Sequence, residues 1–213
     1  MTEHIVLVGD STLDNGAYTG CEPDVVTHLR DLLPAGWQAT LCAVDGSTTA
    51  ELPSQLLNVP ADTSRLVVSV GGNDALLNAD VLDMPVASTA EALELFASRA
   101  DTFESSYRRA LVTVLELGKP TVVCTIYNGQ LGDGAEAHAA RAALRFFNDA
   151  ILRVAFQHAL PVIDLRLVCA VPEDYANPIE PSGIGGRKIA EAVLVAVDAS
   201  RWGSVVIGLA CGR

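Results

Sequence analysis

Short apolar runs alternate along the chain with longer segments whose apolar positions recur at helical spacing. The apolar runs predict five strands, at 4–9, 38–44, 65–71, 121–127 and 161–165. The other segments predict helices at 23–33, about 49–57, 88–118, about 136–158 and about 183–201. Such alternation is typical of βαβ units, which build a parallel sheet covered by helices on both faces. An apolar tail at 204–209 is suited to a further strand at the sheet edge.

The clearest helical signal begins at Ser88. Glu91 follows at the spacing of a capping box, and Gly118 precedes Pro120 at the other end. The apolar positions of this segment alternate steps of three and four: Leu93, Phe96, Ala100, Phe103, Tyr107, Ala110, Val114 and Leu117. Because this spacing places them on one face, we expect a core stripe whose aromatic rings bind no ligand. Ser182 is the expected N-cap of the last helix.

The composition is that of one enzyme-sized domain. The 213 residues are 50% hydrophobic, and no internal repeat, low-complexity linker or change of composition divides them, so residues 1–213 are interpreted as a single domain. The 26 acidic and 14 basic residues give a net charge of −12, which repels phosphate backbones and anionic lipid headgroups. Neither nucleic acid nor a membrane is therefore expected as a partner.

The start of the chain and its cysteines bear on location and on metal binding. Residues 1–4 provide no basic signal-peptide region, and no uncharged stretch approaches the roughly 18 residues of a membrane span, so a cytoplasmic location is expected. The five cysteines are widely spaced and include no CxxC pair, which argues against a disulfide framework or a zinc site. Asp10, Asp45 and Asp74 lack ligand spacing within one element, and neither a metal nor another cofactor is expected.

The tripeptide Gly9-Asp10-Ser11 closes the first predicted strand, at the end where open α/β sheets form their ligand crevice. A serine hydroxyl attacks a carbonyl only when a base takes its proton, and the reaction also needs donors for the developing oxyanion. The loop after the second strand contains Gly46, whose backbone can approach a ligand closely, and the loop after the third contains Asn73, an amide donor. The three loops meet at one crevice if their strands are neighbours in a parallel sheet.

These loops, together with the stretch from Pro181 to Ala190, make the chain resemble the SGNH hydrolase superfamily, also called the GDSL esterase/lipase family. The resemblance covers nearly the whole chain. It implies a three-layer α/β/α sandwich with a five-stranded parallel sheet of the flavodoxin-like kind. It also implies that Ser11 is the nucleophile of an ester hydrolase. The implied oxyanion hole consists of the backbone N–H groups of Ser11 and Gly46 and the side chain of Asn73, whereas Asp10 only holds the turn.

One motif departs from the family pattern. The family's Asp-x-x-His, which supplies the acid and base of its triad, corresponds here to Asn177-Pro178-Ile179-Glu180, and no histidine follows His158. A glutamate can act as a general base, but its reference pKa of about 4.3 lies roughly two units below that of histidine, about 3 kcal/mol in proton affinity. Burial of Glu180 must recover that difference. The leading hypothesis is a Ser11/Glu180 dyad in which Asn177 donates a hydrogen bond that orients Glu180 or its loop.

Two alternatives to this base stay open. In the first, His138 reaches Ser11 from the polar, glycine-rich loop at 128–134, which is suited to a mobile lid. In the second, the base has been lost, and the domain binds an acyl or glycosyl ligand without turning it over.

The expected partner is a small-molecule ester. The family spans carboxylesterases, thioesterases, lysophospholipases and carbohydrate acetylesterases. The loops of this chain contain no obvious long apolar groove, and the segment 127–135 is polar and rich in glycine, which favours a short acyl group or a polar alcohol. No feature of the sequence favours a particular oligomeric state.

Overall fold

The computed structural model describes residues 3–199 and 206–208. Its strands are β1 (His4–Gly9), β2 (Gln38–Leu41), β3 (Arg65–Ser69), β4 (Thr121–Cys124), β5 (Val162–Ile163) and β6 (Val206–Ile207). They form one sheet in the order β2-β1-β3-β4-β5-β6, and all neighbouring pairs are parallel. The α/β class is confirmed, whereas the expected number of five strands is too low by one. The additional strand, β6, lies in the apolar tail, of which only 206–208 belong to the described residues.

Each predicted strand begins within one residue of its expected start, but four of the five end early. At the end of β2 the reason is visible in the hydrogen bonds. The backbone N–H groups of Cys42 and Ala43 both donate to the Leu7 carbonyl, at 2.8 and 2.9 Å. Two residues opposite one break the regular pairing, as in a β-bulge, and the chain leaves the sheet. The apolar residues beyond the strand ends therefore belong to the loops at the carboxyl edge of the sheet.

The helices are α1 (Val25–Leu32), α2 (Leu52–Gln55), α3 (Gly72–Leu77), α4 (Thr89–Leu115), α5 (Ala135–Gln157), α6 (Leu165–Val168) and α7 (Gly183–Ala199), with 3-10 turns η1 (Leu56–Asn58), η2 (Ala79–Asp83) and η3 (Pro172–Asp174). Both predicted N-caps are present. The Ser88 Oγ accepts from the Glu91 N–H at 3.1 Å, and the Ser182 Oγ accepts from the Gly185 N–H at 3.2 Å. α2 and η1 lie within or at the end of the predicted helix at about 49–57, whereas α3, α6, η2 and η3 were not predicted because such short segments carry no periodic signal. The predicted end of the last helix at 201 lies outside the described residues.

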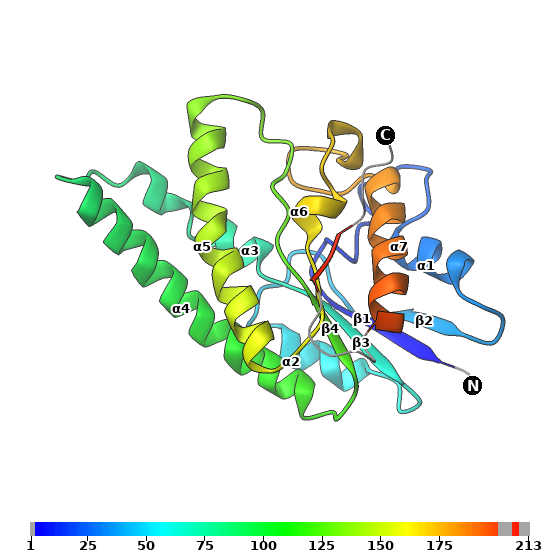
Figure 1. Ribbon diagram of the computed structural model, residues 1–213. Helices are drawn as coiled ribbons and strands as arrows, with labels where there is room; N and C mark the ends of the chain where they lie inside the picture. The colour runs from blue at the N-terminus through cyan, green and yellow to red at the C-terminus, as the bar shows by residue number, and fades with distance from the viewer. Residues whose placement is uncertain (1–2, 200–205, 209–213) are drawn as a thin grey trace.

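Helices cover both faces of the sheet, as Figure 1 shows: α1 and α7 lie on one side, and α4 and α5 lie on the other. The side chains of β1 alternate between these layers. Ile5 and Leu7 join the core cluster under α1 and α7, whereas Val6 and Val8 join the cluster under α4 and α5. The fold is therefore the three-layer α/β/α sandwich expected from the sequence. Of the helices within the described residues, none has the length and apolarity that crossing a membrane requires.

The apolar stripe of α4 is buried over only part of its length. Phe103 and Tyr107 are buried against the sheet and α5, but Leu93 near the start of the helix is 53% exposed. Phe96 is partly buried and stacks on Phe146 of α5, with ring centroids 5.4 Å apart. Figure 1 shows the reason, since the amino-terminal half of α4 extends past the strands. The expectation of a core stripe along the whole helix is therefore wrong at its amino-terminal end and at Leu117, which lies beyond α4 and is 38% exposed.

Candidate active site

The loops after β1, β2 and β3 meet at the carboxyl edge of the sheet because these three strands are neighbours. Gln55 of α2 ties the first two loops together. Its Nε2 donates to the Gly9 carbonyl at 2.7 Å and to the Ser47 Oγ at 3.1 Å, and its Oε1 accepts from the Gly9 N–H at 2.8 Å. Asn73 ties the third loop to the second, since its Nδ2 donates to the Ser47 carbonyl at 2.9 Å. The predicted convergence of the three loops is therefore confirmed.

Gly9 allows the first loop to turn tightly against β3. Its φ is +137°, and a Cβ at this position would lie 1.7 Å from the carbonyl oxygen of Ser69. Asp10 donates its backbone N–H to that same carbonyl at 2.9 Å. Only glycine fits this contact. The turn places Ser11 at the end of the strand, where it is 7% exposed and lines a cavity.

Two backbone donors and one side-chain donor are available beside Ser11. The N–H groups of Ser11 and Gly46 have no acceptor within the part of the chain that the structure describes. The Asn73 amide uses one of its two N–H bonds for the Ser47 carbonyl and keeps the other. Gly46 is exposed at φ +78° and does not line the cavity, whereas Ser11 and Asn73 do. Of the three expected oxyanion donors, two thus lie at the cavity itself.

Glu180 lines the same cavity as Ser11 and is 7% exposed. Burial raises the pKa of its carboxyl group above the ordinary value of 4.5; a hydrogen bond from the Ser11 side chain opposes this shift, and the charge of Asp45 adds to it. One carboxylate oxygen, Oε2, is buried and has no hydrogen-bond partner among the described residues. The structure thus brings together Ser11 and Glu180, which the sequence analysis paired, and leaves an oxygen that can accept a proton.

The loop that carries Glu180 is fixed through its backbone. Three carbonyl groups of residues 178–181 accept from the Tyr127 hydroxyl at 2.6 Å, the Gln130 N–H at 2.8 Å and the Asn15 side chain at 3.2 Å. Sequence reasoning missed Tyr127 and Asn15 because both bind main-chain groups that are remote in sequence. Their one signal was position, since each comes after the carboxyl end of a strand. These bonds fix the place of Glu180 independently of its own side chain.

Asn177 contributes to the same loop as an acceptor. Its Oδ1 accepts from the N–H groups of Ile179 and Glu180, both at 2.9 Å, in an Asx turn. The residue is exposed. These contacts agree with a role in orienting the loop, but the expectation that Asn177 donates the bond is wrong. Its partners are the backbone N–H groups of the turn, so Asn177 orients the backbone of the loop and not the carboxylate group of Glu180.

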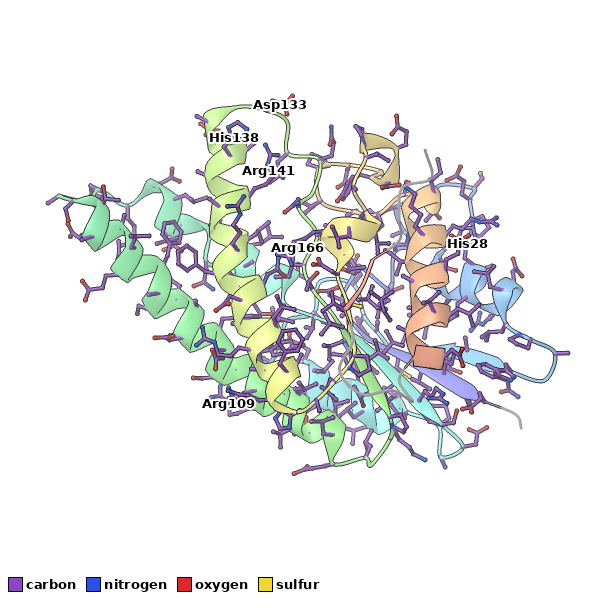
Figure 2. All side chains as sticks on the ribbon, viewed as in Figure 1. His28, Arg109, Asp133, His138, Arg141 and Arg166 are labelled. Carbon is purple, nitrogen blue, oxygen red and sulfur yellow. The ribbon has the colours of Figure 1, made fainter. Side chains whose placement is uncertain are left out.

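His138 does not approach Ser11 in this structure. It lies in the first turn of α5 and is exposed, and Figure 2 shows it at that end of the helix near Asp133 and Arg141. It is not among the residues that line the cavity. The geometry therefore gives no support to His138 as the base.

A second carboxyl group, that of Asp10, is buried beside the site. Its Oδ1 accepts from the Thr12 N–H at 3.1 Å. Burial raises the pKa of Asp10 from 3.8 to about 7; hydrogen bonds from Thr12 and Gly72 oppose the shift, and the charge of Glu180 adds to it. Two carboxyl groups thus share one desolvated region. Even so, no group of three or more His, Cys, Asp or Glu side chains within the described residues is arranged to hold a metal ion.

Replacing Asp10 by asparagine is expected to flatten the pH dependence of stability. The native pKa of about 7 lies above the unfolded value of 3.8, so the native state holds this proton more tightly. The resulting stability is fully present below pH 3.8 and is lost as the pH rises through about 7, a change of about 4 kcal/mol. Urea denaturation should show the free energy of unfolding of D10N rising by that amount relative to the wild type over this range. Parallel pH profiles would contradict the shifted pKa.

The cavity at Ser11 and Glu180 has a volume of about 180 Å³. Ser11, Glu180 and Asn73 form a polar end of the cavity. Most of the remaining lining is apolar and comes from α3, η2, the segment 126–131 and α5. No long apolar groove was expected from the sequences of the loops, yet the cavity between them has a mostly apolar wall. A large part of this wall comes from α3, η2 and α5, which is why the sequences of the strand-end loops gave little sign of it.

One family model matches most of the chain. This model, described as GDSL-like Lipase/Acylhydrolase family, covers residues 7–185, which include Ser11, Asn73 and Glu180. A comparison with curated proteins finds no match.

Solved structures of the same fold cover nearly the whole chain. An extracellular lipase from Streptomyces rimosus aligns with a TM-score of 0.69 at 16% identity, over 92% of this chain and 100% of its own. A phospholipase A1 from Streptomyces albidoflavus gives 0.65 at 18% identity, over 94% and 100%. A catalytic mutant of an acetylxylan esterase from Geobacillus stearothermophilus gives 0.64 at 16% identity, over 92% and 94%. At these identities the likeness is one of fold.

Proposed function

Since the chain belongs to the GDSL-like lipase/acylhydrolase family, we propose that it is a serine esterase that hydrolyses carboxylic esters through an acyl-enzyme at Ser11. The observation that carries the proposal is the pairing of Ser11 with Glu180 at the polar end of an apolar cavity. A serine is a weak nucleophile until a base removes its proton. Burial raises the pKa of Glu180 and so makes it a stronger base, which offsets part of the deficit against imidazole.

In the first half-reaction, Glu180 takes the proton of the Ser11 hydroxyl while the Oγ attacks the carbonyl carbon of the ester. The carbonyl electron pair moves onto its oxygen, which accepts hydrogen bonds from the N–H groups of Ser11 and Gly46 and from the Asn73 amide. The bond to the leaving alcohol then breaks, and the departing alkoxide takes the proton from Glu180. The acyl group is now bound to Ser11, and Glu180 is ionised again.

Water completes the cycle. Glu180 takes a proton from a water molecule whose oxygen attacks the acyl carbonyl, and the same donors bind the second oxyanion. When the bond to the Ser11 Oγ breaks, the serine takes the proton from Glu180 and the carboxylic acid leaves. One water is consumed in each turnover, and the protein returns to its starting state.

The cavity limits the acyl group that fits directly beside Ser11. Its volume of about 180 Å³ is slightly larger than the roughly 150 Å³ of an engineered apolar cavity that binds benzene, so it holds an acyl chain of about six carbons. The surroundings of Glu180 outside this cavity are polar: the Tyr18 hydroxyl donates to Asp45 at 2.7 Å, and the charge of Asp45 acts on Glu180. The first six or so carbons of an acyl chain and a polar alcohol suit these two environments.

Covalent labelling tests the nucleophile. A fluorophosphonate transfers its phosphonyl group to an activated serine with loss of fluoride. Intact-mass spectrometry is expected to show one adduct on the wild-type chain and none on Ser11→Ala, with peptide mapping to place the adduct at Ser11. Circular dichroism should show that the variant keeps its fold. A wild-type chain that binds acyl or glycosyl ligands but is never labelled would instead favour a binding domain without turnover.

A further inference from the structure

A second apolar groove lies beside the cavity, between the amino-terminal parts of α4 and α5 and the segment from η2 to Val86. Its volume is about 360 Å³, twice that of the cavity, and every residue that lines it has an apolar side chain. Val81, Leu82 and Ala143 line both spaces, so the groove adjoins the cavity. The groove is therefore placed to extend the site that begins at Ser11.

Small residues on α5 create this groove. Ala139, Ala142 and Ala143 recur at helical spacing and line it on one side. The stacked rings of Phe96 and Phe146 contribute to its wall, where α4 and α5 meet. The neighbouring face of α5, with Ala140, Leu144 and Phe147, lines the cavity at Ser11 and not the groove. One helix thus serves both spaces, and the alanines determine how much room the groove offers.

Several of the apolar residues that line the groove are open to solvent. Leu82 is 38% exposed, Met84 is 41% exposed and Leu93 is 53% exposed. Single exposed apolar side chains are ordinary, but a contiguous set that continues a ligand cavity indicates a binding surface. Because no polar side chain lines the groove, the part of a ligand that enters it is hydrocarbon.

We propose that the acyl chain of a long-chain ester, of about ten carbons or more, runs from Ser11 through the cavity, passes Val81, Leu82 and Ala143, and ends in this groove. This inference rests on the proposed function. The cavity holds about six carbons, so the rest of a longer chain either enters the adjoining groove or stays in water. Each methylene transferred from water to an apolar surface strengthens binding by about fourfold. The enzyme then accepts short esters and favours long ones.

Ala142→Phe tests the groove without altering the cavity, because Ala142 is exposed and lines only the groove. With monomeric p-nitrophenyl esters, kcat/KM of the wild type is expected to rise from butanoate to dodecanoate. In the variant, the value for butanoate should stay within about twofold, while that for dodecanoate falls at least about tenfold. Ala139→Phe is a second variant with the same expected result. Ala135→Phe, exposed in the first turn of α5 and outside both spaces, is the matched control.

Binding of the free acids separates this inference from the esterase proposal. Isothermal titration calorimetry should show that A142F weakens dodecanoate binding at least about tenfold and leaves butanoate binding unchanged. If turnover that depends on Ser11 is absent but this difference remains, the esterase proposal fails and the groove stands. If A142F changes both chain lengths alike, or leaves dodecanoate unaffected in turnover and binding, the groove is overturned while the esterase proposal stands.

Discussion

Replacing Glu180 by glutamine is expected to lower kcat/KM for p-nitrophenyl butanoate by about 10³-fold, within the roughly 10²- to 10⁴-fold range of general-base catalysis. The amide keeps the size of the side chain but cannot take the proton of Ser11 at neutral pH. In the wild type, the Oε2 of Glu180 is buried at the cavity without a hydrogen-bond partner among the described residues, so this oxygen is available for the proton. Stopped assays with the purified variant measure the loss, and thermal unfolding checks that the fold is retained.

The pH profile separates a base from a residue with a structural role. In the wild type, kcat/KM should fall on the acid side as Glu180 is protonated, and burial moves this fall above the ordinary glutamate pKa of 4.5. The double variant Asn177→Asp, Glu180→His installs an Asp-x-x-His pattern, so its acid limb should follow an imidazole, with a reference pKa of about 6.5. Full activity in E180Q, or one acid limb common to wild type and double variant, would refute the assignment.

Asn73→Ala is expected to lower kcat by about 10²- to 10³-fold, the loss typical of removing one oxyanion donor. In the proposed mechanism, the second N–H of the Asn73 amide donates to the carbonyl oxygen, whose negative charge is largest in the transition state. KM should therefore change little. Steady-state kinetics with a p-nitrophenyl ester separate the two constants.

A control is needed because Asn73 also links two loops through the Ser47 carbonyl. Thr49→Val removes another bond between the same loops, from the Thr49 hydroxyl to Asp74 at 2.7 Å, without removing an oxyanion donor. This variant should lose less than about tenfold in kcat. Equal losses in the two variants would show that loop position, and not the amide donor, accounts for the effect.

Features that depend on the positions of strand ends were predicted best from the sequence. The apolar run before Gly9 located β1, and the similar runs at 38–44 and 65–71 located its two neighbours in the sheet. Parallel strands bring their carboxyl ends to one edge, so the loops with Ser11 and Asn73 meet whatever the details of packing. The capping signals at Ser88 and Ser182 were equally reliable, because a cap depends on residues only three apart.

Features that depend on which elements become neighbours in space were not predicted. Periodicity placed Leu93 and Phe103 on one face of α4, but it does not tell where the sheet beneath that face ends. The cavity draws on α3, η2 and α5, and the groove on η2, α4 and α5, so no single segment shows either of them. The raised pKa of Asp10 likewise depends on burial and on the charge of Glu180, 170 positions later in the chain.

The hydrogen bonds to the loop at 178–181 are made by carbonyl groups, and carbonyl groups are the same whatever side chain each residue carries. Gly9 is different, since its contact with Ser69 admits no side chain at all. The two halves of the site are therefore unequally open to evolutionary change. The turn that presents Ser11 depends on glycine at position 9, whereas in the proposed mechanism the backbone bonds would hold position 180 in place with either an imidazole or a carboxylate. If Glu180 is the base, as proposed, such an exchange would change the pH range of activity before it changed the fold.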